Sequence, residues 1–76
     1  MGLYVSVQKV ADDGRLATYS FTTLDGPERT LVVDREEQRI WPEDGNQDGI
    51  FRGAVQALVR AWRKHGELPD KALQRS

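Results

Sequence analysis

The sequence predicts an α+β fold, in which a four-stranded antiparallel β-meander carries one C-terminal α-helix on one face (ββββα). Residues 3–10 and 15–23 alternate apolar and polar side chains, which is typical of strands with one buried face. Short stretches rich in Asp and Gly follow these segments, as turns require. Only residues 49–65 repeat their apolar side chains with the period of a helix. A helix that is apolar on one side needs a surface to cover, and the predicted sheet supplies it.

The chain has 76 residues, no cysteine and a net charge of −1. This length predicts a single domain over residues 1–76. Without cysteine, disulfides, thiolate metal sites and a cysteine nucleophile are excluded, and the balanced charge gives no general attraction to nucleic acid or membranes. Apolar runs are only a few residues long, and the N-terminus lacks the pattern of a signal peptide. We therefore expect a soluble, cytoplasmic protein that does not contact a membrane.

The first two predicted strands form a hairpin whose register depends on the length of its turn. A two-residue turn would set the valines of the first strand beside polar side chains of the second. A three-residue turn with Gly14 in the left-handed conformation brings Val5 opposite Phe21. It also brings Val7 opposite Tyr19, so that one face of the hairpin is apolar. We predict the three-residue turn with a G1 bulge.

The third and fourth predicted strands cover residues 29–33 and 39–41. A four-residue loop between them turns Ile40 toward the core and Trp41 outward. A three-residue loop would exchange these two side chains. We predict the four-residue loop.

The predicted helix begins after a capping residue, Asp48 or Asn46, and ends at Gly66, which suits a left-handed C-terminal position. The tail of residues 67–76 is short and charged, and we expect it to fray. The apolar face of the helix is predicted to consist of side chains at alternating steps of four and three: Phe51, Val55, Leu58, Trp62 and His65. Four further apolar side chains widen this stripe: Ile50, Ala54, Ala57 and Ala61.

The loop over residues 44–49 matches the first half of a calcium-binding loop, D-x-N-x-D-G. The twelfth position of such a loop needs a carboxylate, but here it is Val55. A turn followed by a helix cap explains the same residues, and we expect no metal and no cofactor. His65 is the only histidine, and Ser6 and Ser20 lie in predicted strands without a nucleophile elbow. No catalytic residue is predicted, so we do not expect an enzyme.

Basic residues gather on the predicted helix. Residues 49–66 hold four basic residues and no acid, whereas residues 34–48 hold six acids and two arginines. The four cations could contact nucleic-acid phosphates, or they could form a solvated face on which the C-terminal cations offset the helix dipole. Since exposed aromatic side chains do not alternate with them, we expect no binding to DNA or RNA at physiological salt. The four residues are Arg52, Arg60, Arg63 and Lys64.

The sheet face away from the helix is predicted to be polar apart from Trp41, Tyr4 and Val32. An outward Trp on a polar sheet is typical of a contact anchor. The other interpretation is that Trp41 closes the sheet edge or packs under the loop of residues 43–47. We predict a small, non-catalytic protein-binding or regulatory module that uses this face for an unidentified protein partner or for a homodimer. A nucleic-acid-binding module that uses the basic helix face is the alternative.

Two resemblances accompany these predictions. The segments LVVDREEQRI (residues 31–40) and AWRKHGELP (residues 61–69) resemble a family of small bacterial sheet-plus-helix proteins without an established activity. The segment DREEQRIWP (residues 34–42) is similar to the start of the MbtH-like motif, although the later Trp-Thr-Asp of that motif is absent. MbtH-like proteins bind adenylation domains of peptide synthetases, and this resemblance implies that Trp41 and Pro42 lie on the partner surface.

Overall fold

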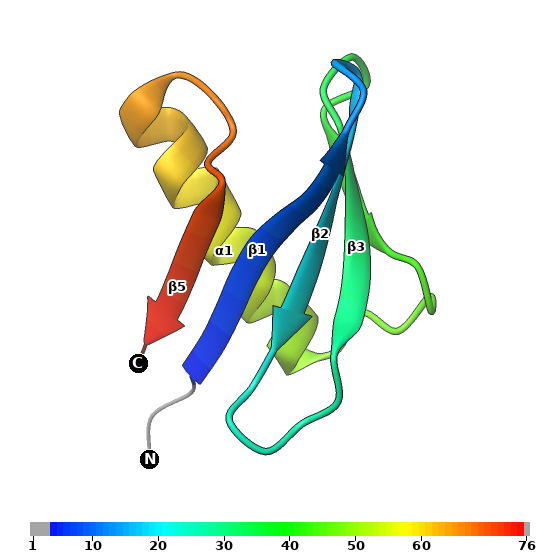
Figure 1. The fold of residues 1–76 in the computed structure, drawn as a ribbon, viewed down its shortest axis with the longest axis vertical. Helices are drawn as coiled ribbons and strands as arrows, with labels where there is room; N and C mark the ends of the chain where they lie inside the picture. The colour runs from blue at the N-terminus through cyan, green and yellow to red at the C-terminus, as the bar shows by residue number, and fades with distance from the viewer. Residues whose placement is uncertain (1–3, 76) are drawn as a thin grey trace.

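The computed structural model describes residues 4–75, in which five strands form one antiparallel sheet and one helix lies against it (Figure 1). The strand order in the sheet is β4-β3-β2-β1-β5. Leu3, the predicted start of the first strand, lies outside the described residues. In chain order, the elements are β1 (Tyr4–Asp12), β2 (Leu16–Thr22), β3 (Arg29–Asp34), β4 (Arg39–Pro42), α1 (Gly49–His65) and β5 (Lys71–Arg75).

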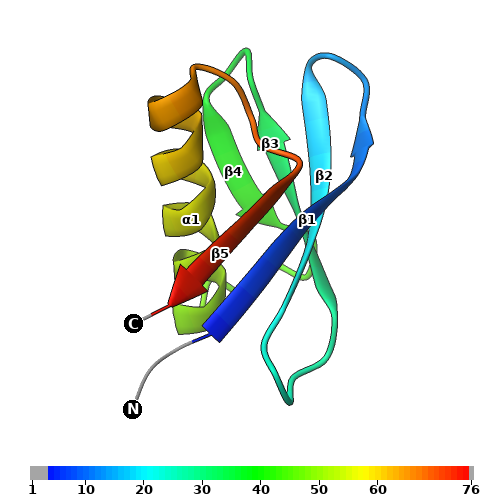
Figure 2. The ribbon, with the colours of Figure 1, turned by 60° about the vertical axis from the view of Figure 1, so that its left-hand side comes forward.

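The structure has two layers, with α1 on one face of the sheet and the other face uncovered (Figure 2). The chain leaves β4 at one edge of the sheet, crosses the face as α1 and returns at the opposite edge as β5. The predicted α+β class with an antiparallel sheet and one helix is therefore confirmed, with a fifth strand in addition. Within residues 4–75, no helix is both long and apolar enough to cross a membrane.

The fifth strand corrects the prediction that residues 67–76 fray, because Lys71–Arg75 form β5. This strand pairs antiparallel with β1, with Ala72 opposite Val7 and Gln74 opposite Val5. The segment between helix and strand is also held, since the Tyr19 hydroxyl donates to the Pro69 carbonyl oxygen at 2.6 Å. Burial of the ring raises the pKa of Tyr19 to about 12, which keeps this donor protonated.

The register of the first hairpin differs from the predicted one by two residues. Val7 lies opposite Phe21, and Lys9 lies opposite Tyr19. The register then shifts by one residue between Lys9 and Ala11, where the ladder contains a bulge. The predicted inward face of both strands is kept, because a shift of two residues returns each side chain to the same face.

The turn of this hairpin is also tighter than the predicted three-residue loop. The Asp13 amide donates to the Leu16 carbonyl oxygen at 3.1 Å, which leaves two residues, Gly14 and Arg15, at the tip. Gly14 has a φ of 97°, in the left-handed region predicted for it. Next to this tip the pairing differs from the predicted one by three residues, and the bulge within β1 reduces the difference to two.

The hairpin of β3 and β4 has the predicted register. Ile40 lies opposite Val33 and packs against the core, while Trp41 lies opposite Val32 on the uncovered face. The four residues between the two strands form the predicted four-residue turn.

The bounds and both caps of the helix are as predicted. The Asp48 carboxylate accepts a hydrogen bond from the Phe51 amide at 2.9 Å, and Gly66 has a φ of 76°. The Gly66 amide donates to the Trp62 carbonyl oxygen at 2.8 Å and closes the last turn.

The buried face of α1 is shifted to one side of the predicted apolar stripe, toward Ala54 and Ala57. Val55 and Trp62 are only half-buried and His65 is exposed, because α1 packs mainly on β5 and β1 at one side of the sheet. The fully buried side of the helix therefore consists of Phe51, Gly53, Ala54, Ala57 and Leu58.

The core lies between this side of α1 and the inward side chains of the sheet. Its largest members have no exposed surface or almost none: Tyr19, Phe21, Leu31, Leu58, Val5, Val7 and Val33. Phe21 and Phe51 join the two layers near the start of the helix, with ring centroids 6.2 Å apart. Apolar burial of this kind provides most of the free energy of folding.

Leu58→Ala tests this packing. The substitution should lower the free energy of unfolding by about 2–5 kcal/mol, as buried Leu-to-Ala changes do. Arg63→Ala, on the exposed side of the same helix, is the control and should change it by less than about 0.5 kcal/mol. Urea denaturation measures both. A loss below about 1 kcal/mol for Leu58→Ala would show that the side chain is not fully packed.

Candidate interaction surfaces

Trp41 and Val32 lie side by side on the sheet face that α1 leaves uncovered. They are direct partners in the ladder between β3 and β4, and both side chains are half-buried. The guanidinium carbon of Arg39 lies 5.8 Å from the centroid of the Trp41 ring, within the range of a cation–π contact. This arrangement places an aromatic, an aliphatic and a charged side chain on one corner of the uncovered face.

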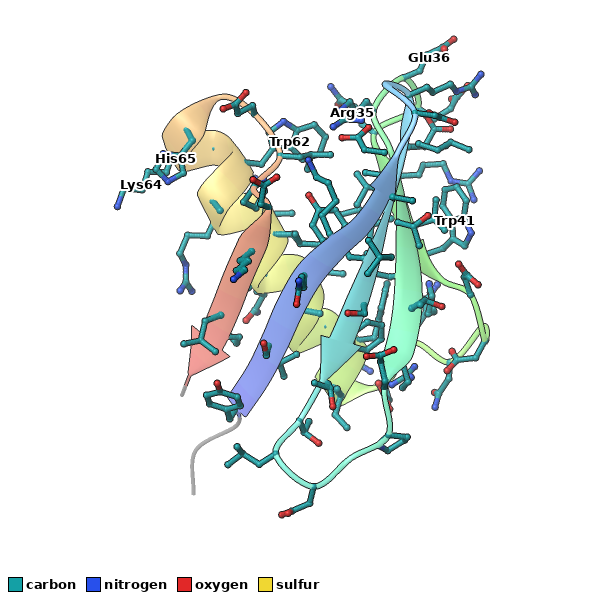
Figure 3. All side chains as sticks on the ribbon, in the orientation of Figure 1. Arg35, Glu36, Trp41, Trp62, Lys64 and His65 are labelled. Atoms are coloured by element: carbon teal, nitrogen blue, oxygen red, sulfur yellow. The ribbon has the colours of Figure 1, made fainter. Side chains whose placement is uncertain are left out.

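Trp41 has features of both predicted environments, the outward contact anchor and the ring packed against the loop of residues 43–47. The indole lines a shallow hollow together with Pro42 and with Gly45 and Gln47 from the loop that precedes α1. The ring therefore neighbours the loop on one side and keeps an exposed surface on the other. Figure 3 shows Trp41 on the opposite side of the molecule from the end of α1.

Tyr4, the third residue predicted for this surface, does not join Trp41 and Val32. It lies at the start of β1, opposite Arg75 of β5, whereas Trp41 lies on β4 at the other edge of the sheet. The two aromatic side chains are thus separate contact points. Small hydroxyl side chains occupy the face between them, all half-buried: Ser6, Thr18, Ser20, Thr22 and Thr30.

Two exposed leucines on this face were not singled out in the sequence. Leu16 is 36% exposed and pairs with Asp34, one row away from Val32 and Trp41. Side chains alternate between the two faces of a strand, and Ala17 faces the core, so the sequence could have placed Leu16 on the uncovered face. Leu73 is 42% exposed and pairs with Ser6. It was missed because its strand was not predicted.

Ion pairs join the tips of the two hairpins, which lie together at one end of the sheet (Figure 3). Both guanidinium nitrogens of Arg35 donate to the Asp12 carboxylate at 2.7 Å. In the reverse direction, Arg15 of the first tip donates to Asp34 at 3.3 and 3.4 Å. These hydrogen bonds hold the pKa of Asp12 and the pKa of Asp34 below their usual range. Bidentate pairs fix geometry as well as charge, so the two tips are held in register.

Arg29 occupies the centre of the loop that resembles half of a calcium site. Its side chain is 12% exposed, and its guanidinium group donates to Asp44 at 2.8 Å and to Asp48 at 2.9 Å. It also donates to the Asn46 carbonyl oxygen at 2.7 Å and lies 4.8 Å from the centroid of the Phe21 ring. The loop therefore surrounds a cation that the chain itself provides.

The charges of this cluster stabilise one another. The hydrogen bond from Arg29, followed by that from the Asn46 amide, lowers the pKa of Asp44. The cap hydrogen bond from the Phe51 amide, followed by that from Arg29, lowers the pKa of Asp48. In the described part of the chain, no group of three or more His, Cys, Asp or Glu side chains is arranged to hold a metal ion. Both carboxylates bind Arg29, and Asp48 also caps α1.

The four basic residues predicted on the helix are all exposed. Among residues 4–75 none of the four forms an ion pair, in contrast to Arg15, Arg29 and Arg35. Arg52 donates to the Gln47 carbonyl oxygen at 3.3 Å. Lys64 projects from the last turn of α1, away from the sheet (Figure 3). The helix therefore presents uncompensated positive charge.

The residues considered for catalysis lie far apart. His65 is exposed at the end of α1, whereas Ser6 and Ser20 lie on the sheet face that the helix does not cover. A nucleophile and its base must lie within hydrogen-bond reach, and these residues are on opposite sides of the sheet.

Comparison of the chain with protein-family models, with curated proteins and with solved structures finds no match. The two resemblances drawn from the sequence stay predictions.

Arg29→Gln tests the role of this arginine as the cation of the loop. The substitution leaves Asp44 and Asp48 without a positive partner, so we expect the melting temperature to fall by several degrees. Millimolar calcium should leave the melting temperature of the unmodified protein unchanged, because Arg29 already occupies both carboxylates. A saturable shift of the amides of residues 44–49 on addition of calcium to the unmodified protein would contradict this role.

Proposed function

We propose that this protein is a small, non-catalytic protein-binding or regulatory module whose contact surface is the uncovered sheet face around Trp41 and Val32. The observation that supports it is the pairing of these two side chains on a face without a covering element. Leu16 enlarges the apolar part of this corner. The occupant is an unidentified protein or a second copy of the chain.

The physical argument is that interface energy concentrates in few side chains. A Trp with one exposed side supplies large apolar contact area from a side chain with two rotatable bonds, which makes it a frequent binding anchor. The hydroxyl side chains around Thr18 and Ser20 provide a polar surround that keeps the unbound face soluble. Tyr4, at the far corner, is a second contact for a partner that spans the sheet.

Nucleic-acid binding through the helix is the second candidate function. It is favoured by the exposure of Arg52, Arg60, Arg63 and Lys64 and by the lack of acidic partners for them among the described residues. We place it second because Trp62 is half-buried and packs against the core, which leaves only part of its ring for stacking on bases.

Trp41→Ala tests the first proposal. The variant should keep its fold, because the ring is outside the core, and should weaken the captured partner or the homodimer by about 30-fold or more, as loss of an anchor worth about 2 kcal/mol does. Thr18→Ala, in the same row of the same face, is the matched control and should change affinity little. Pull-down from native extract followed by calorimetry, or sedimentation for a homodimer, measures the effect. Equal binding by Trp41→Ala and the unmodified protein would overturn the proposal.

Titration with fluorescent mixed-sequence DNA and RNA tests the second candidate. At physiological salt we expect no measurable binding, since four cations on one helix give little affinity once counterions screen them. Micromolar binding that falls steeply with salt, and that the double variant Arg60→Glu with Arg63→Glu abolishes, would make nucleic-acid binding the preferred function.

A further inference from the structure

β5 ends the sheet, and its outer edge has no neighbouring strand among the described residues. It is the last strand in the order and lies beside α1 (Figure 2). Unlike β4, the other edge strand, it contains no proline. Proline on an edge strand hinders further pairing, because it has no amide to donate. β5 is therefore the less protected edge of the two.

The ladder with β1 defines which backbone groups point outward from β5. The Lys9 amide donates to the Asp70 carbonyl oxygen at 2.8 Å, so these two residues form a hydrogen-bonded pair. In an antiparallel ladder such pairs alternate, which turns the amides and carbonyls of Ala72 and Gln74 toward β1. Those of Lys71 and Leu73 point away from the sheet. This edge offers both donors and acceptors to an added strand.

A row of helix side chains follows the same edge on the covered side of the sheet. The Gln74 side-chain amide donates to the Gln56 side-chain oxygen at 3.4 Å, which places Gln56 against β5. Arg60 and Lys64 follow at successive steps of four residues, so they continue the row along the helix. Both are exposed, and neither has an ion-pair partner among residues 4–75. We call Gln56, Arg60 and Lys64 the edge stripe.

We propose that the outer edge of β5 and the edge stripe together bind an acidic protein segment in extended conformation, which joins the sheet as a sixth strand. Its backbone pairs with Lys71 and Leu73. Because side chains alternate along a strand, its carboxylates face Arg60 and Lys64. The side chains between them lie beside Leu73, which is 42% exposed.

Charge favours an acidic segment over a second copy of this strand. Two copies paired through β5 would bring Lys71 and the edge stripe of each molecule close to those of the other. Like charges of this kind oppose association. A segment with carboxylates on one face and apolar side chains on the other would place the carboxylates beside the edge stripe and the apolar side chains beside Leu73. The surface around Trp41 is at the opposite edge of the sheet, so this binding site does not depend on it.

The experiment uses the full chain and a capped peptide of about eight residues that alternates Glu and Val, the length that adds one strand to a sheet. Hydrogen exchange of the free protein should be fast at the Lys71 and Leu73 amides and slow at Ala72 and Gln74. With the peptide, the Lys71 and Leu73 amides should become protected. A peptide that alternates Lys and Val should not protect them.

Charge reversal provides the matched comparison. Arg60→Glu with Lys64→Glu should weaken binding of the Glu-Val peptide about tenfold or more, because it reverses the edge stripe. Arg60→Glu alone is compared with Arg39→Glu, which makes the same change in net charge on β4 at the opposite edge of the sheet and should leave binding nearly unchanged. Leu73→Pro removes one outward donor and should also abolish the protection of the Lys71 amide. Trp41→Ala should bind the peptide as the unmodified protein does.

Four results would overturn the proposal. The first is no protection at any peptide concentration, and the second is protection on β4 instead of β5. The third is an equal loss from Arg60→Glu and Arg39→Glu, which would indicate attraction without a defined site. The fourth is tighter binding of single-stranded RNA than of the peptide through Arg60 and Lys64, which would assign the edge stripe to nucleic acid.

Discussion

The structure depends on the burial of one sheet face beneath a single helix. Tyr19, Phe21 and Leu31 of the sheet and Leu58 of α1 are removed from water together, and apolar burial is the main favourable term in folding. Because one helix covers only one face, the opposite face must remain in contact with solvent. Its Ser and Thr side chains tolerate this, whereas Trp41 and Val32 form an apolar corner. The candidate contact surface therefore exists because α1 covers only one of the two sheet faces.

Ion pairs divide the charged residues into two groups. Arg15 and Arg35 join the hairpin tips, and Arg29 holds the loop that starts the helix. These arginines are next to carboxylates and contribute little net field outside the molecule. The cations of α1 lack such partners among the described residues, so the positive potential gathers on the helix and beside β5. A chain with a net charge of −1 therefore still presents a basic surface.

Much of the fold followed from local signals in the sequence. The bounds of α1 were predictable because Asp48 and Gly66 satisfy the ends of the helix by themselves. The outward position of Trp41 was predictable because loop length fixes alternation in a short hairpin. For the candidate site, the sequence indicated Trp41 with Val32, but it could not show that Tyr4 lies at the other edge of the sheet. That distance depends on strand order.

The sequence by itself determined the class of the fold, the helix and the inward face of each strand in the meander, because alternation and capping act within a few residues. Only the tertiary structure decided β5 and the register of β1. In β5 the inward positions are Ala72 and Gln74, so no apolar alternation marks the strand, and it forms because β1 and α1 offer it a surface. The bulge after Lys9 depends equally on the strand opposite. Both choices are made by contacts between residues distant in the chain, which local patterns do not encode.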